Sequence, residues 1–242
     1  MSSTRIAMWS GPRNISTTMM RSFENRPDCA VIDEPFYSHY LENTGLDHPM
    51  REEILKSQPT NPDAVITEII AKSETPLTFC KMMTQHITDK VKTEWLGQMQ
   101  HFFLIREPLR MLASYAEKAA DHQSVYTALK QEVDLFEIIT SQTGKPPPIL
   151  DAQDILTNPQ AMLIRLCEVL GIPFYPEMLR WPAGPRASDG VWAPHWYKSV
   201  ETSTSFRPPT VGCVTLSKGL QEIADACEPH YLKLYEMRLI AK

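Results

Sequence analysis

The chain has 242 residues, of which 43% are hydrophobic, and its formal net charge at neutral pH is −5. This length predicts a single domain over residues 1–242 with a sizeable core, and the acidic balance excludes a general attraction for nucleic acid or for an anionic membrane. Any anion site must therefore be built locally.

The five cysteines are scattered, contain no C-x-x-C pair and are odd in number. This pattern argues against a zinc site and a disulfide framework, and it predicts buried thiols in a reducing compartment. The N-terminus lacks the apolar core of a signal peptide, and no run reaches the roughly 18 apolar residues of a membrane helix. We therefore expect a soluble, cytoplasmic protein with no nucleic-acid or membrane partner.

The segment from Arg5 to Phe23, RIAMWSGPRNISTTMMRSF, predicts a strand, a loop and a helix. Residues 6–9 are continuously apolar, as in a strand that is buried on both faces of a parallel sheet. Gly11 and Pro12 turn the chain, and Ser16 is the predicted N-cap of the helix. The first amide groups of a helix have no internal partner, so this turn can bind an anion.

The spacing Gly11-x4-Ser16-Thr17-Thr18 copies the phosphate-binding loop G-x4-G-K-[ST], with Ser16 in place of the second glycine and Thr17 in place of the lysine. NTPases use that lysine to reach the terminal phosphates, so its absence argues against ATP or GTP hydrolysis. A different anion remains compatible with the loop. The alternative is an ordinary strand, loop and capped helix without a ligand.

Four more short apolar runs predict strands at 29–32, 77–80, 102–105 and 149–150. The residues that follow the first three runs are charged. Asp33 and Glu34 follow the first, Lys81 the second and Arg106 the third. Sites in α/β proteins form at the ends of strands. The alternation with helices predicts an α/β fold with an open, mostly parallel, doubly wound sheet flanked by helices.

Three regions differ from this alternation. Residues 36–75 contain two expected helices, at 51–57 and 62–72, and predict a cap or insertion. Residues 182–210 are rich in Pro, Gly, Ser and Trp and predict a loop that acts as a lid. In the last segment, 216–239, Pro229 is expected to separate two helices.

The helices between these regions have clear start and stop signals. Pro108 suits the first position of one helix, and a longer helix is expected from Val125 to about Ser141. Asn158-Pro159 opens a further helix that Gly171 closes.

The strand predicted at 102–105 runs into Arg106-Glu107-Pro108-x5-Ser114, and here the sequence resembles the sulfotransferase family. That family uses a phosphate loop without lysine near its N-terminus and an R-x-P-x5-S signature for a 3′-phosphate. Residues 149–174 are similar to the family's late strand, Pro-opened helix and L-G-[IL]-P, so the resemblance covers roughly residues 5–174. One departure is that the loop has an additional residue between Arg13 and the threonine pair, where the family reads P-[RK]-S-G-T-T.

The resemblance implies a P-loop-like fold and transfer of a sulfuryl group from 3′-phosphoadenosine 5′-phosphosulfate to a hydroxyl or amine of a small-molecule acceptor, without a metal. It implies that Thr17 and Thr18 hold the 5′-phosphosulfate and that Arg106 and Ser114 hold the 3′-phosphate. The residues expected to bind the nucleotide are Gly11, Pro12, Arg13, Asn14, Ser16, Thr17, Thr18, Arg106, Ser114, Arg186 and Trp192.

Arg186 and Trp192 belong to the expected lid. Arg186 would be a further phosphate ligand and Trp192 would stack on the adenine. The alternative for the tryptophan is that it anchors the loop by burying apolar area.

Three residues are expected to carry the chemistry. Lys81 would meet the departing oxygen, and either Glu34 or His86 would take the acceptor proton. Glu34 is favoured by its position after a strand and by its resemblance to the glutamate of tyrosylprotein-type and some bacterial sulfotransferases. His86 is five residues after Lys81, which differs from the K-x-H spacing of the cytosolic enzymes. The alternative to a catalytic role is that Asp33 and Glu34 are solvated acids at a helix N-terminus and that His86 is a surface imidazole.

Two rival functions share the same anion loop. A small-molecule kinase would need a substitute for the loop lysine and a carboxylate for magnesium, and a non-catalytic nucleotide-binding module would not need Glu34. The sequence identifies neither the acceptor nor the oligomeric state.

Overall fold

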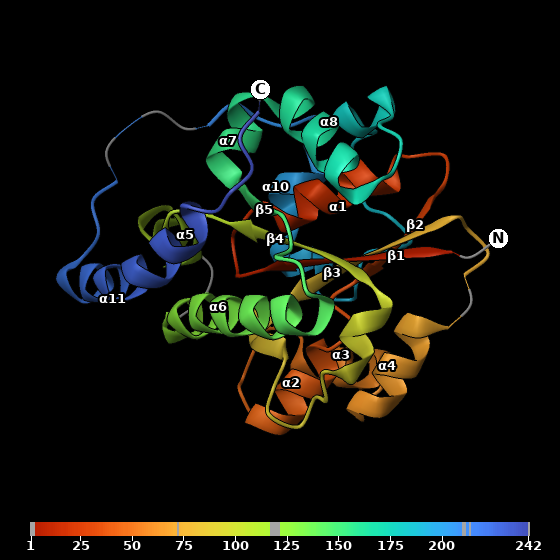
Figure 1. The fold of residues 1–242 in the computed structure, drawn as a ribbon. Coiled ribbons are helices and arrows are strands. Elements are labelled where there is room, and N and C mark those ends of the chain that lie inside the picture. The colour runs from red at the N-terminus through yellow and green to blue at the C-terminus, as the bar shows by residue number, and fades with distance from the viewer. Residues whose placement is uncertain (1–2, 72, 117–121, 210–211, 213, 242) are drawn as a thin grey trace.

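The computed structural model describes residues 3–71, 73–116, 122–209, 212 and 214–241. Its centre is one sheet of five parallel strands in the order β2-β3-β1-β4-β5 (Figure 1). The strands are β1 Thr4–Ser10, β2 Cys29–Asp33, β3 Leu77–Met83, β4 Gln100–Ile105 and β5 Ile149–Asp151. The predicted open, parallel α/β sheet is thus confirmed, with each strand near its expected place.

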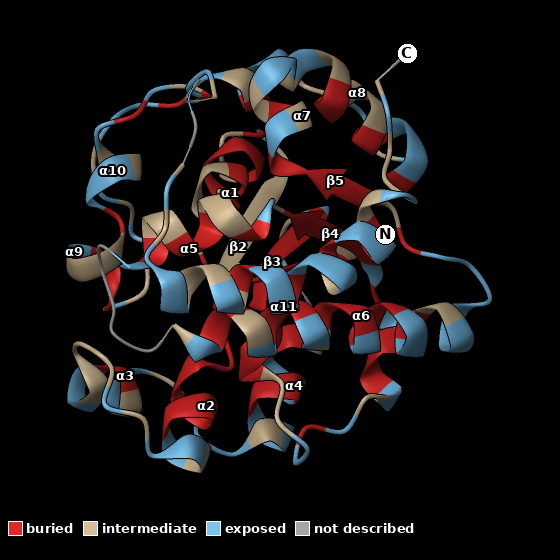
Figure 2. Ribbon diagram, turned by 90° about the vertical axis from the view of Figure 1, so that its left-hand side faces the viewer, coloured by how far each residue is buried: buried red, intermediate tan, exposed pale blue. Residues whose placement is uncertain are grey.

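The apolar runs form strands because both faces of the sheet are covered. In β1, Ile6 and Met8 contribute to one core cluster, and Ala7 and Trp9 contribute to the cluster on the opposite face. Successive side chains of a strand point to opposite faces, so such a strand is apolar throughout. Figure 2 shows β3, β4 and β5 as mostly buried strands inside a shell of partly exposed helices, whereas the edge strand β2 is mostly of intermediate burial.

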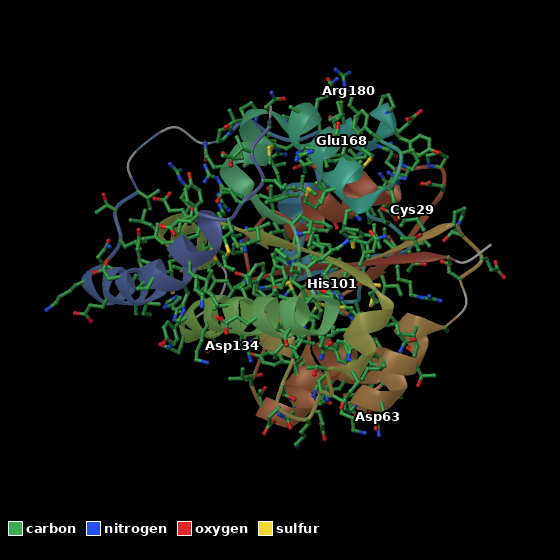
Figure 3. The ribbon with its side chains drawn as sticks, in the orientation of Figure 1. Cys29, Asp63, His101, Asp134, Glu168 and Arg180 are labelled. Atoms are coloured by element: carbon green, nitrogen blue, oxygen red, sulfur yellow. The ribbon has the colours of Figure 1, made fainter. Side chains whose placement is uncertain are left out.

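Helices cover both faces of the sheet (Figure 1). One face carries α1 Ser16–Glu24, α7 Ala152–Thr157 and α8 Pro159–Leu170, and the other carries α4 Pro62–Ile70 and α6 Gln123–Thr143. Figure 3 shows Asp63, Asp134 and Glu168 on the outer sides of α4, α6 and α8. The remaining helices are α2 Tyr37–Thr44, α3 Arg51–Ser57, α5 Pro108–Ala116, α9 Ala193–Trp196, α10 Lys198–Glu201 and α11 Lys218–Tyr235. Single 3₁₀ turns lie at Thr84–His86, Glu94–Gln98 and Pro176–Leu179.

Two local expectations are wrong. Ser16 is not the N-cap of α1: Ile15 occupies that position with φ 57° and caps no amide with its side chain. Pro229 does not divide the last segment, because it lies inside the continuous helix α11. Burial of Cys227, Tyr231 and Leu234 along this helix offsets the backbone hydrogen bond that proline removes.

The other regional expectations concern the cap, the lid and the cysteines. The proposed cap contains α2, α3 and α4, and the proposed lid contains α9 and α10. The four described cysteines are free thiols, and three of them are buried. Three residues that belong to these expectations, Lys72, Thr210 and Cys213, lie outside the described residues. In the described part of the chain, no helix has the length and apolar character needed to cross a membrane.

The strand order places the start of α1 at a switch point of the sheet. The chain leaves β1 toward β3 and β2 on one side, and it later forms β4 and β5 on the other side. In open α/β sheets, ligands bind at the carboxyl ends of the strands where the order reverses in this way. The residues that follow β1, β2, β3 and β4 meet at this edge.

Candidate functional site

A cavity of about 380 Å³ lies at the carboxyl edge of the sheet. Its walls come from the loop after β1, from the ends of β2, β3 and β4, from α5 and from residues 196–208. The predicted site residues that line it are Pro12, Arg13, Ser16, Thr17, Thr18, Glu34, Lys81, His86, Arg106 and Ser114. The structure therefore brings residues as far apart as Arg13 and Ser114, which are 101 positions apart, to one pocket.

Gly11 and Asn14 do not line the cavity but hydrogen-bond the phosphate loop to α6 and β4. The Gly11 N–H donates to Glu132 Oε1 at 2.8 Å, and Asn14 Nδ2 donates to the Leu104 carbonyl at 2.8 Å. A Cβ atom on Gly11 would lie 3.0 Å from the Met111 side chain, which is tighter than an ordinary contact. The same Cβ atom would lie 3.3 Å from the Ala128 Cβ atom on α6, so the loop packs closely against α5 and α6 at this glycine.

Backbone strain concentrates at the cavity. Among the described residues that are not glycine, four have positive φ, and three of these line the cavity: Arg13 at 62°, Ile15 at 57° and Glu34 at 40°. The fourth is Met50. Such conformations are rare for β-branched residues and cluster at functional sites. The turn at Ile15 also leaves the first amides of α1 without a side-chain cap, beside Ser16.

We call Arg13, Arg106 and Ser114 the anion corner. Arg13 Nε donates to Ser114 Oγ at 2.9 Å, and Arg106 Nη1 donates to the Arg13 carbonyl at 2.6 Å. Burial lowers the pKa of Arg106, and the charges of Arg13 and Arg110 lower it further. No carboxylate within the described ranges forms an ion pair with Arg106. Two cations held side by side in this way favour a bound anion.

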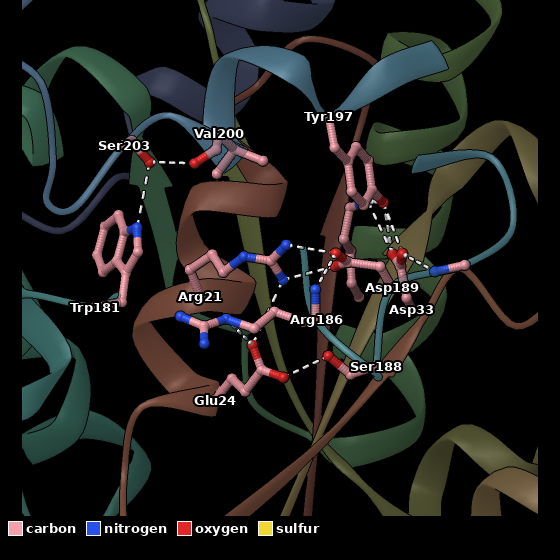
Figure 4. A network of polar contacts seen from close by, with 12 residues as sticks. Arg21, Glu24, Asp33, Trp181, Arg186, Ser188, Asp189, Tyr197, Val200 and Ser203 are labelled. Atoms are coloured by element: carbon pink, nitrogen blue, oxygen red, sulfur yellow. Dashed lines mark hydrogen bonds and ion pairs between the residues drawn. The ribbon is translucent and has the colours of Figure 1, made fainter. Parts of the chain in front are cut away.

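A buried charge network lies on the other side of the loop. Lys81 Nζ donates to Asp33 Oδ1 at 3.0 Å, to Glu34 Oε1 at 2.6 Å and to Tyr197 Oη at 2.5 Å. The Tyr197 hydroxyl in turn donates to Asp33 Oδ2 at 2.7 Å (Figure 4). An ammonium has three N–H donors. All three are engaged here, so Lys81 presents no further donor to a ligand.

Burial and charge act against each other in this network. Burial raises the pKa of Glu34, and the positive charge of Lys81 opposes that shift. Burial lowers the pKa of Lys81, but Asp33 and Glu34 outweigh it, so the pKa of Lys81 is raised. The ammonium is therefore charged, and the Glu34 carboxylate is a stronger base than an exposed glutamate.

His86 lines the cavity and is 2% exposed. Its ring is stacked between Tyr37 and Tyr40, with centroid distances of 4.5 and 4.8 Å. Nδ1 lies 4.0 Å from Glu34 Oε2 and makes no hydrogen bond to the described residues. Burial, followed by the charge of His48, lowers the pKa of His86 well below its usual value. This imidazole is neutral and a weak base.

Arg186 and Trp192 do not line the cavity. Arg186 Nη2 donates to the Pro182 carbonyl, and Nε lies 3.7 Å from a carboxylate oxygen of Glu24 on α1 (Figure 4). Trp192 is 1% exposed, and its Nε1 donates to Tyr197 Oη at 3.0 Å. Trp192 therefore anchors the segment, as the alternative interpretation of the sequence held.

Ion pairs fasten the 182–209 segment over α1. Arg21 is almost fully buried; its Nη2 donates to Asp189 Oδ2 at 2.7 Å, and its Nη1 lies 2.7 Å from Asp189 Oδ1 in an ion pair. Ser188 donates a short hydrogen bond to Glu24, and the Gly190 N–H donates to Asp33 Oδ2 at 3.1 Å (Figure 4). The segment is thus connected to the same carboxylate that binds Lys81.

The sequence did not assign a role to Asp33, Tyr37, Tyr197 or Arg207. Asp33 is the last residue of β2, and Tyr37 begins α2 three residues after Glu34. Their position just after a strand was the sequence signal available for both. Tyr197 and Arg207 come from a segment without periodicity, and packing over α1 brings them to the cavity. No local pattern marks them.

Comparisons with solved structures identify the fold. The sulfotransferase domain of the olefin synthase of Synechococcus PCC 7002 superposes with a TM-score of 0.55 and 16% identity, covering 93% of this chain and 94% of that one. A sulfotransferase from Alicyclobacillus acidocaldarius gives a TM-score of 0.56 at 10% identity, covering 99% and 98%. At such identities the likeness shows a shared fold.

Two curated relatives come from Arabidopsis thaliana. Branched-chain-amino-acid aminotransferase-like protein 1 is 39% identical over 205 residues, and protein 2 is 35% identical over 232 residues. The matches cover 84% and 93% of this chain but 37% and 40% of the relatives, so the chain spans about two fifths of their length. The model of the family described as "Sulfotransferase domain" matches residues 4–234. The chain therefore belongs to the sulfotransferase domain family.

Proposed function

We propose that this chain transfers a sulfuryl group from 3′-phosphoadenosine 5′-phosphosulfate to a hydroxyl group of a small molecule. One observation carries the proposal: the anion corner and the buried Glu34–Lys81 pair open into the same cavity, with the uncapped start of α1 between them. The donor has two separate anionic groups, and a site for it needs two separate places for negative charge.

The donor fits the cationic half of the cavity. Arg106 has a lowered pKa and no carboxylate partner among the described residues, so a phosphate would relieve the repulsion by Arg13. Ser114 adds a hydroxyl to the same corner. Thr17 and Thr18 line the cavity in the first turn of α1, and we propose that their amides and side chains hold the 5′-phosphosulfate, since anions bind at helix N-termini.

In the proposed reaction, the acceptor hydroxyl lies between Glu34 Oε2 and His86 Nδ1, whose separation of 4.0 Å allows one oxygen to reach both. Glu34 takes the proton as the acceptor oxygen forms a bond to sulfur. The bond from sulfur to the bridging phosphate oxygen breaks, and adenosine 3′,5′-bisphosphate leaves. Glu34 is the base because its pKa is raised by burial, whereas that of His86 is lowered.

The role proposed for Lys81 differs from the one expected from the sequence. Its three donors are taken by Asp33, Glu34 and Tyr197, so it does not offer an N–H to the leaving oxygen. We propose that Lys81 keeps Glu34 ionised and oriented. Charge on the leaving oxygen is then stabilised by Arg13 and by the amides of α1.

Replacing Arg106 tests the donor site. Arg106→Ala should weaken binding of adenosine 3′,5′-bisphosphate about ten- to hundredfold, because a charge-assisted bond to phosphate contributes about 1.5–3 kcal/mol. Binding of adenosine 5′-phosphate should hardly change, which also reports that the loop remains folded. Calorimetry with both nucleotides measures this, with Arg180→Ala on the exposed surface as the control. Equal losses for the two nucleotides would contradict the assignment.

Replacing Glu34 separates binding from chemistry. Glu34→Gln keeps the size of the side chain, so the affinity for adenosine 3′,5′-bisphosphate should stay near the wild-type value. Turnover should fall about 10²–10⁴-fold, the usual contribution of a general base. His86→Ala should cost much less. Full activity of Glu34→Gln beside an inactive His86→Ala that still binds the nucleotide would assign the base to the histidine.

Two further outcomes belong to the rival functions. Tight binding of ATP with magnesium in place of adenosine 3′,5′-bisphosphate would indicate a phosphotransferase. Binding of adenosine 3′,5′-bisphosphate without transfer to any acceptor in a broad library would indicate a nucleotide-binding module.

A further inference from the structure

Glu132 on α6 is a buried carboxyl group that the proposed reaction does not use. None of its surface is exposed. Its Oε1 atom accepts the hydrogen bond from the Gly11 N–H at 2.8 Å, and its Oε2 atom is buried without a hydrogen-bond partner among the described residues. Acidic side chains are seldom fully buried unless they are paired. The partner that the structure gives this one is Gly11, the residue with which the phosphate loop leaves β1.

The phosphate loop has an unfavourable backbone conformation, so its surroundings must hold it. Arg13 and Ile15 have φ of 62° and 57°, and residues other than glycine keep such values only where neighbouring contacts impose them. Two of these contacts come from side chains that do not line the cavity: Glu132 accepts from Gly11, and Asn14 donates to the Leu104 carbonyl. Glu132 and Asn14 can therefore influence a ligand only through the loop.

The peptide unit between Ser10 and Gly11 is held at both ends. Its N–H donates to Glu132 on α6, and its carbonyl accepts from Thr84 Oγ1 at the longer distance of 3.5 Å. A peptide unit is planar, so a contact at either end fixes the orientation of the whole unit. Without the carboxyl oxygen of Glu132, the Gly11 N–H would be a buried donor with no partner, and the loop would shift to satisfy it.

The charge state of Glu132 suits an anion on the other side of the loop. Burial raises its pKa well above the ordinary value, the N–H of Gly11 opposes that shift, and no charged side chain among the described residues contributes to it. The protonated carboxyl group accepts from Gly11 without adding a negative charge under the loop. An ionised carboxylate at this place would repel the 5′-phosphosulfate.

We infer, on the basis of the proposed function, that Glu132 is a positioning residue for the donor: by fixing the Gly11 N–H, it holds the phosphate loop in the conformation that binds the 5′-phosphosulfate. It touches neither the donor nor the reacting atoms. Arg106, in contrast, is proposed to bind the 3′-phosphate directly. The two ends of the nucleotide then depend on different residues, and nucleotides that carry only one of the two phosphates separate them.

Calorimetry with adenosine 5′-phosphate, adenosine 3′-phosphate and adenosine 3′,5′-bisphosphate tests this role. Glu132→Met removes the acceptor of the Gly11 N–H but has a similar volume, so the core remains filled. We expect about tenfold weaker binding of the two nucleotides with a 5′-phosphate, and binding of adenosine 3′-phosphate within about twofold of wild type. Glu137→Met, on the exposed face of the same helix, is the matched control and should bind all three like wild type.

Glu132→Gln separates the hydrogen bond from the charge. The amide oxygen of glutamine can accept from Gly11, and the side chain is neutral, so all three nucleotides should bind within about twofold of wild type at pH 7. A general loss of structure in Glu132→Met would weaken all three nucleotides alike and would appear in urea unfolding. Tenfold tighter binding of adenosine 5′-phosphate to Glu132→Gln would show that the carboxyl group is ionised and opposes the donor, which would overturn the inference.

Glu132→Asp provides a second test of the same contact if Glu132→Met does not fold. It keeps the carboxyl group but withdraws it from Gly11 by about 1.5 Å, so the same selective loss for the 5′-phosphate is expected. Equal losses for the 5′- and 3′-phosphates in folded variants, or no loss, would refute the positioning role. The donor assignment would then stand if Arg106→Ala shows its own expected loss. If the wild-type chain does not bind adenosine 3′,5′-bisphosphate, the proposed function is wrong and this inference fails with it.

Discussion

Replacing Tyr197 with phenylalanine tests whether one hydroxyl ties the 182–209 segment to the buried charges. The hydroxyl oxygen accepts from Lys81 Nζ at 2.5 Å and from Trp192 Nε1 at 3.0 Å, and the hydroxyl donates to Asp33 at 2.7 Å. Tyr197 is 4% exposed. Phenylalanine retains the ring and its packing, so the substitution removes hydrogen bonds without opening a large cavity.

The magnitude follows from what each partner retains. Lys81 and Asp33 keep each other, because Nζ and Oδ1 are 3.0 Å apart. The Trp192 N–H becomes a buried donor without a partner, which costs about 1–3 kcal/mol, and one charge-assisted bond adds about 1.5–3 kcal/mol. These contacts share one oxygen and are not additive, so we expect the free energy of unfolding to fall by about 3 kcal/mol.

Urea unfolding measures this loss, and Tyr175→Phe provides the control. The ring of Tyr175 packs against Arg26, but its hydroxyl makes no hydrogen bond to the described residues. Hydrogen exchange should also show faster exchange of the amides of 182–209 in Tyr197→Phe. A loss below about 1 kcal/mol, or one equal to that of the control, would refute the idea that this hydroxyl holds the segment.

Two buried titratable groups predict how stability depends on pH. Burial raises the pKa of Glu132 well above its ordinary value. The folded protein therefore keeps a proton that the unfolded chain releases above about pH 4.5. As a result, the free energy of unfolding should fall with rising pH by up to about 1.4 kcal/mol per pH unit. Glu132→Gln should remove this slope in urea unfolding at pH 6 and 8, whereas Glu137→Gln on the exposed face of α6 should keep it. Burial lowers the pKa of His101 to about 4, so the stability present above pH 6.5 should fall by about 3 kcal/mol as the pH drops toward 4. An NMR titration that places the His101 pKa near 6.5, as in an exposed histidine, would contradict this.

The parallel sheet was predictable because its strands contribute apolar side chains to the cores on both faces. Each strand is a short apolar run, and each run ends at a charged or turn-forming residue. The carboxyl ends of parallel strands meet at one edge, so Glu34, Lys81 and Arg106 could be expected to approach one another. The positions of these residues directly after predicted strands were therefore enough to predict that they lie near one another.

The parts that the sequence did not reveal depend on long-range packing. The hydrogen bonds of Lys81 could not be anticipated, because Tyr197 is 116 positions away and reaches it through the fold of a segment without periodicity. The N-cap assigned to Ser16 followed a residue preference, but the positive φ of Ile15 moved the start of the helix by one residue. Pro229 remains inside α11 because tertiary burial outweighs the local penalty.

The presence of two carboxylates on one buried lysine has a consequence for the proposed proton transfer. With both carboxylates ionised, the cluster of Asp33, Glu34 and Lys81 carries a net charge of −1 away from solvent. When Glu34 accepts the acceptor proton, Lys81 keeps Asp33 and Tyr197 as partners, and the cluster becomes neutral. Burial disfavours net charge, so it favours this change, and it is the largest cause of the raised pKa of Glu34. Without Asp33, the same transfer would leave a buried ammonium with no counter-ion, which would oppose it. On this argument Asp33 touches no reacting atom but determines how readily Glu34 can act as a base.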